Sequence, residues 1–171
     1  MMEHIVAFLV LTVAVGFDWK HYRIPNTLVL IGFGAGLILS VIREGSMGLL
    51  HGLLRAAIPV FALYLLFFVR TLGAGDIKLF AVTATMCSTT EEVWKIILLS
   101  FVIGAVIGLI RLLLNGQLFV RISNFVTYFL QCVQSQSVEP YQTIAPKEAY
   151  LHFSVCILLA YAAVTLWEVR V

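Results

Sequence analysis

Apolar residues occur along this chain in long runs that are separated by short polar segments. The pattern predicts six helical segments, at approximately Ile5–Tyr22, Asn26–Ile42, Leu49–Val69, Gly75–Thr89, Val93–Leu114 and Ala149–Trp167. A helix needs about 20 residues to cross the ~30 Å apolar core of a bilayer, and most of these runs reach or approach that length. We therefore expect an all-α fold, a polytopic membrane helical bundle with about six transmembrane helices.

The first and fourth runs contain the only two aspartates of the chain, Asp18 and Asp76. The uncharged stretch between His4 and Asp18 would span only about 20 Å as a helix, which is too short to cross. The first helix must therefore continue past Asp18 to about Tyr22, whereas the fourth begins beside Asp76. Both carboxylates are expected slightly inside the membrane boundary. A carboxylate there is costly unless it faces protein or water, so both are candidates for a functional site.

Residues 115–148 interrupt the series of spans. Polar side chains recur every three or four residues from Gln117 to Gln134, and apolar residues cover the rest of the helix surface. This periodicity predicts an amphipathic helix that lies in the cytoplasmic membrane interface. The alternative is a seventh span, which would place the C-terminus inside the cell. With 115–148 as a cytoplasmic loop, residues 1–171 form a single membrane-embedded domain.

The basic residues are distributed unevenly over the two sides of the predicted bundle. The side that carries both aspartates has seven of the eleven Lys and Arg residues, namely Lys20, Arg23, Arg70, Lys78, Arg111, Arg121 and Lys147. The excess of positive charge in cytoplasmic loops then predicts that both aspartates face the cytoplasm. Six spans would place both termini outside.

Composition supports a membrane protein and argues against several other classes. Charged residues make up 12 % of the chain, compared with about a quarter in a soluble domain. The net charge of +2 and the lack of a basic run do not indicate nucleic-acid binding. The three cysteines are widely spaced, with no CxxC pair, so we predict neither a metal site nor another cofactor. Gly32 and Gly36 are four residues apart, which predicts close helix packing rather than a nucleotide loop.

Two carboxylates that lie close together suit the hydrolysis of a peptide bond. One keeps its proton while the other is charged, so the charged group can take a proton from water and the protonated group can bind the scissile carbonyl. Asp76 ends the segment Gly73-Ala74-Gly75-Asp76. Glycines there would permit unusual backbone angles and the close approach of a substrate. For each aspartate alone, the alternative is a helix cap or a partner for a nearby Lys or Arg.

The two aspartate segments resemble the motifs of the type IV prepilin peptidases. Asp18-Trp19-Lys20-His21-Tyr22-Arg23-Ile24-Pro25-Asn26 is similar to the first motif, and Gly73-Ala74-Gly75-Asp76-Ile77-Lys78-Leu79 resembles the GxGD box. The resemblance implies an aspartic endopeptidase of the bacterial inner membrane, which cuts the basic leader from prepilins or pseudopilins at the cytoplasmic face. It implies that Asp18 and Asp76 are the catalytic pair and that Gly73 and Gly75 shape the loop. It also implies supporting roles at the site for Lys78, Pro25 and Asn26.

One difference from the longer members of that family narrows the resemblance. Those members carry an additional region with paired CxxC motifs and also methylate the new N-terminus, and this chain has no such motif. It resembles the compact, peptidase-only branch associated with Flp/Tad-type pili, so methyltransferase activity is not expected.

Two other functions remain as alternatives on the sequence alone. A presenilin-like intramembrane protease also has a GxGD motif, but here Phe17 precedes the first aspartate instead of a tyrosine, and there is no Pro-Ala-Leu motif. A non-enzymatic transporter or assembly subunit could use the aspartates as proton carriers. The sequence leaves open which aspartate is protonated, which pilin is cleaved, the oligomeric state, and whether residues 117–134 gate the site.

Overall fold

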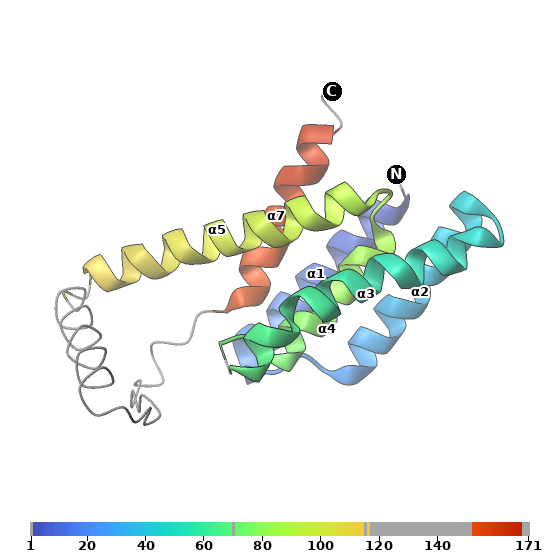
Figure 1. Ribbon diagram of the computed structural model, residues 1–171. Helices are drawn as coiled ribbons and strands as arrows, with labels where there is room; N and C mark the ends of the chain where they lie inside the picture. Colours follow the sequence, from blue (N-terminus) through green and yellow to red (C-terminus); the bar gives the residue numbers. More distant parts are fainter. Residues whose placement is uncertain (1, 70, 115, 117–151, 169–171) are drawn as a thin grey trace, which may run out of the picture. The chain divides into compact units, whose positions relative to one another are not determined.

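The computed structural model describes residues 2–69, 71–114, 116 and 152–168, and every regular element in these residues is a helix (Figure 1). The helices are α1 (Met2–His21), α2 (Asn26–Glu44), α3 (Met47–Phe68), α4 (Ala74–Met86), α5 (Thr90–Leu114) and α7 (Phe153–Glu168). Each begins and ends within a few residues of a predicted run. The prediction of an all-α fold is therefore confirmed for the described residues.

Not every helix has the length of a membrane span. Four of the described helices, α1, α2, α3 and α5, are long and apolar enough to cross a membrane. Helix α4 has 13 residues and α7 has 16, so both fall short of the predicted length. The six predicted spans are thus confirmed only in part. The amphipathic helix predicted for residues 117–134 lies outside the described residues.

The chain divides into two units, residues 1–103 with 152–171 and residues 104–151. In the second unit, the described residues are the last part of α5 and residue 116. A single domain over residues 1–171 stays a prediction. Both aspartates belong to the first unit.

Helix α4 is the central helix of the first unit, since it contacts α1, α2, α3 and α7. Its sequence has no polar face after the first turn, which is typical of a helix surrounded by protein. Its buried residues follow one another without a gap from Leu79 to Met86. A short helix in this position presents its N-terminus, with Asp76, to the ends of its neighbours.

Helix α2 packs closely against α4 through its two spaced glycines. A Cβ on Gly36 would lie 1.9 Å from Oγ1 of Thr85, and one on Gly32 would lie 2.9 Å from Cγ1 of Val82. Neither position has room for a side chain. The prediction that this glycine spacing serves helix packing is therefore confirmed.

A cluster of charged side chains lies at the C-terminal end of α4. We call it the Glu44 cluster, and it consists of Glu3, Arg43, Glu44, His51 and Arg55. Glu44 accepts hydrogen bonds from Arg43 at 2.8 Å and Arg55 at 3.0 Å, and its second oxygen is 2.6 Å from Nδ1 of His51. Arg43 also pairs with Glu3 at 2.6 Å. The cluster thus joins the ends of α1, α2 and α3.

The turn that connects α4 to α5 is held by side-chain hydrogen bonds, one of which comes from the Glu44 cluster. Nη1 of the buried Arg55 donates a hydrogen bond to the Ser88 carbonyl at 2.6 Å. Thr89 and Glu92 form a capping box, in which Glu92 accepts from the backbone N–H of Thr89 and Oγ1 of Thr89 accepts from that of Glu92. The C-terminal end of α4 is therefore held by several directed bonds.

Candidate active site

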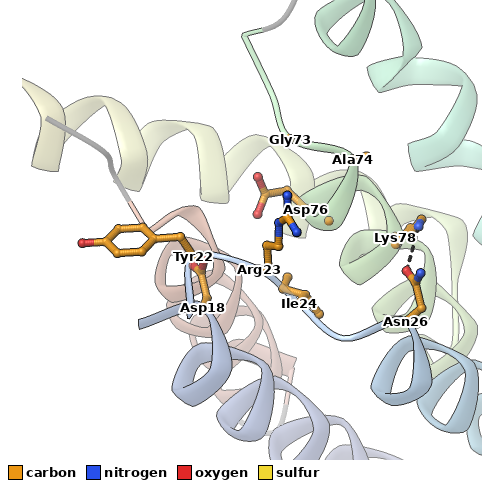
Figure 2. A pocket seen from close by; sticks show the side chains of 10 residues that line it. Asp18, Tyr22, Arg23, Ile24, Asn26, Gly73, Ala74, Asp76 and Lys78 are labelled. Atoms are coloured by element: carbon orange, nitrogen blue, oxygen red, sulfur yellow. Dashed lines mark hydrogen bonds between the residues drawn. The ribbon is translucent and has the colours of Figure 1, made fainter. Parts of the chain in front are cut away.

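Asp18 and Asp76 line the same cavity, which has a volume of about 470 Å³ (Figure 2). Asp18 comes from the last turn of α1 and Asp76 from the first turn of α4. Both side chains are half-buried, and the charge of Asp18 acts electrostatically on the Asp76 carboxyl. The other residues around the cavity are Tyr22, Arg23, Ile24, Asn26, Gly73, Ala74, Gly75 and Lys78.

The local conformation after Asp18 brings the following residues to the cavity. Helix α1 continues past Asp18 to His21, as its length requirement predicted. The chain then turns at Tyr22, whose φ of 53° lies in the left-handed region that few non-glycine residues adopt. The N–H of Tyr22 still donates to the Asp18 carbonyl at 2.9 Å. This turn directs Arg23 and Ile24 along the cavity wall (Figure 2).

The glycines before Asp76 provide space rather than unusual backbone angles. Gly73 is the N-cap of α4 and has ordinary extended angles, φ −75° and ψ 146°, and Gly75 does not have a positive φ either. A Cβ on Gly73 would lie 3.1 Å from Oδ2 of Asp76, whereas one on Gly75 would make ordinary contacts with Ile24 at 3.6 Å. The expectation of special backbone angles was therefore wrong for both glycines. The expected close approach occurs at Gly73, where the neighbouring group is the Asp76 carboxylate of the same chain.

Two of the predicted supporting residues contact each other. Nζ of Lys78 donates a hydrogen bond to Oδ1 of Asn26 at 2.9 Å, which joins α4 to the start of α2 (Figure 2). Both side chains are exposed. Pro25 is the N-cap of α2 with extended angles, and it is not among the residues that line the cavity. Roles in catalysis for these three residues stay predictions.

Sequence reasoning missed two residues that contact Asp18. Oγ of Ser154 donates a hydrogen bond to Oδ2 of Asp18 at 2.5 Å, and Nδ1 of His152 lies 3.5 Å from the same oxygen. Ser154 is fully buried. The available signal was weak, because it consists of a serine and a histidine at the start of an otherwise apolar helix.

The cavity offers groups for acid–base chemistry. It combines two carboxylates with the guanidinium of Arg23 and the ammonium of Lys78. Among the described residues, no cluster of three or more His, Cys, Asp or Glu side chains is arranged to hold a metal ion. The two carboxylates can exchange protons with a water molecule or a substrate that enters the cavity.

Comparison with known proteins identifies the family. The sequence profile of the type IV leader peptidase family matches residues 5–113, a segment that contains both Asp18 and Asp76. No curated protein gave a significant match to the chain, and no solved structure did so. The profile covers more than half of the chain, and it agrees with the resemblance that the two aspartate motifs carry. The chain therefore belongs to the type IV leader peptidase family.

Proposed function

We propose that this protein is an aspartic endopeptidase of the bacterial inner membrane that removes the leader from type IV prepilins or pseudopilins. The observation that carries the proposal is that the only two aspartates of the chain line one cavity. They come from the ends of two different helices, so the fold itself brings them together. Membership of a leader peptidase family supports the choice of a peptide substrate.

The proposed reaction uses water as the nucleophile. One carboxylate takes a proton from the water as the water attacks the scissile carbonyl, and the protonated partner hydrogen-bonds the carbonyl oxygen. The new amine leaves after it receives a proton from the pair. The excess of Lys and Arg on the side of the aspartates favours a cytoplasmic location for this chemistry.

Cleavage of a purified substrate tests the proposal directly. The protein is reconstituted in lipid with a prepilin-like precursor, which has a short basic leader followed by a long hydrophobic helix. Asp18→Asn and Asp76→Asn should each lower the cleavage rate by roughly 10²–10⁴-fold, because each removes one acid–base group. Glu91→Gln is the matched control, since it makes the same change at an exposed residue in the first turn of α5. If both aspartate variants cleave at the wild-type rate, the proposal is wrong.

The position of the cut distinguishes the alternatives. Mass spectrometry of the products should show a cut between the leader and the hydrophobic helix, with no methyl group on the new N-terminus. A cut inside the hydrophobic helix would instead indicate a presenilin-like protease. Proton-coupled flux that needs both aspartates, without any cleavage, would indicate a transporter.

A further inference from the structure

We propose that Ser154 is a positioning residue that fixes the orientation of the Asp18 carboxylate, with His152 as a second, weaker contact. The inference rests on the proposed function, because it assigns a role within the aspartate pair. It concerns the start of α7, which lies outside the matched family segment and contributes none of the described residues that line the cavity.

Both contacts meet at one atom. The Ser154 hydroxyl donates to Oδ2 of Asp18 at 2.5 Å, and Nδ1 of His152 lies 3.5 Å from the same Oδ2. Within the described residues, no hydrogen bond reaches Oδ1. A hydrogen bond to one oxygen fixes the rotation of a carboxylate and leaves the other oxygen to accept a proton or bind water. The Ser154 contact therefore determines how Asp18 is presented to the cavity.

The hydroxyl of Ser154 is not used for its own helix. A serine near a helix N-terminus commonly bonds to the backbone of that helix. Here His152 provides the first backbone acceptor, for the N–H of Val155 at 3.2 Å, while the Ser154 hydroxyl bonds a residue 136 positions earlier in the chain. Ser154 is fully buried, so water has little access to the donor side of this bond.

Two aromatic rings from the end of α1 hold His152 beside Asp18. The imidazole stacks on Tyr22 with ring centroids 5.0 Å apart and on Trp19 at 5.9 Å. The left-handed turn at Tyr22 places its ring in this contact. The end of α1 and the start of α7 thus contact each other beside Asp18.

The second aspartate has a different environment. The backbone of Gly73 acts electrostatically on the Asp76 carboxyl, and no side chain in the described residues donates a hydrogen bond to it. Of the two aspartates, only Asp18 accepts a hydrogen bond from α7 among the described residues.

Substitution of the buried serine tests the inference through the kinetic constants. Ser154→Ala should lower kcat by about 10- to 100-fold, since a misoriented catalytic group is costly, while KM changes little. Ser154→Thr keeps the hydroxyl and should recover most of kcat, whereas Ser154→Cys, with a weaker donor, should behave like the alanine variant. His152→Asn should have a smaller effect than Ser154→Ala.

Ser100→Ala is the matched control, because Ser100 is equally buried but its hydroxyl bonds only the Ile96 carbonyl of its own helix. It should leave kcat unchanged. A Ser154→Ala enzyme with kcat within twofold of wild type, alongside an inactive Asp18→Asn enzyme, would overturn the inference and leave the proposed function intact. Equal losses in the Ser100 and Ser154 variants would also overturn it, since they would reflect packing alone.

A spectroscopic measurement tests the contact without any cleavage assay. Because the chain has only two aspartates, labelling with ¹³C-carboxyl aspartate gives two side-chain signals, which the Asp18→Asn and Asp76→Asn variants assign. Ser154→Ala should shift the Asp18 signal more than the Asp76 signal, and Ser100→Ala should shift neither. An unchanged Asp18 signal would overturn the inference even if the proposed function failed.

Discussion

The two ends of α4 differ in whether the carboxylates near them are paired with basic side chains. At the C-terminal end, the Glu44 cluster pairs each carboxylate with at least one basic side chain, and Glu44 alone contacts Arg43, His51 and Arg55. At the N-terminal end, Asp18 and Asp76 share a cavity, and neither forms an ion pair with a Lys or an Arg among the described residues.

This difference separates groups that hold the fold from groups that are available for chemistry. Opposite charges in contact stabilise the ends of the helices that carry them, although most of that gain offsets the cost of burial. Two carboxylates near each other contribute nothing of this kind, and such unfavourable pairs are found mainly at functional sites. We therefore expect substitutions at one end to change stability and those at the other to change activity.

The largest effect on stability is expected at the Glu44 cluster. Glu44→Gln removes the only carboxylate that pairs with the buried Arg55 in the described residues, so the free energy of unfolding should fall by about 3 kcal/mol. Denaturation in mixed micelles measures this change, with Glu91→Gln as the control. The cleavage rate per folded molecule should stay at the wild-type value, and a selective loss of kcat would contradict the separation of the two ends.

The next effect is expected where α2 meets α4. Gly36→Ala should lower the free energy of unfolding by about 2 kcal/mol, because the new Cβ would collide with Thr85. Gly34 lies on the same helix, and a Cβ added there would have no neighbouring atom within 4 Å, so Gly34→Ala should be neutral or slightly stabilising. Equal stability of the two variants would show that α2 and α4 do not pack as closely as described.

The two glycines of the GxGD segment should differ in activity. Gly73→Ala places a methyl group 3.1 Å from the Asp76 carboxylate and should lower kcat about tenfold by moving that group. Gly75→Ala makes only ordinary contacts and should keep kcat within about threefold of wild type on the same reasoning. A large increase in KM for Gly75→Ala would instead indicate that the substrate backbone passes close to residue 75.

The smallest effect is expected at the exposed bond between α4 and α2. Lys78→Met and Asn26→Ala each break the hydrogen bond between these side chains. Because exposed polar contacts contribute little to stability, the melting temperature should change by no more than about 2 °C. Comparison of each single variant with the double variant measures the coupling, and a catalytic role for either residue would appear as a loss of kcat without a loss of stability.

Much of the fold could be predicted because it follows from local physical requirements. The length of the apolar runs set the helices, and the short run before Asp18 required α1 to continue to His21. The spacing of Gly32 and Gly36 indicated close packing, and the structure contains it. The span count was harder, because α4 is short and surrounded by protein, so its apolar composition does not show whether it crosses the bilayer.

The candidate site was partly predictable for the same reason. Asp18 and Asp76 stand out in the sequence, since a carboxylate in an apolar run is costly and needs a reason. The bond between Ser154 and Asp18 had no such signal, because a buried serine is ordinary in an apolar helix. The sequence by itself determined where the described helices lie and which two carboxylates are candidates for the site. Only the tertiary structure decided that they share a cavity and that α7 orients one of them, because those contacts join residues that are far apart in the chain.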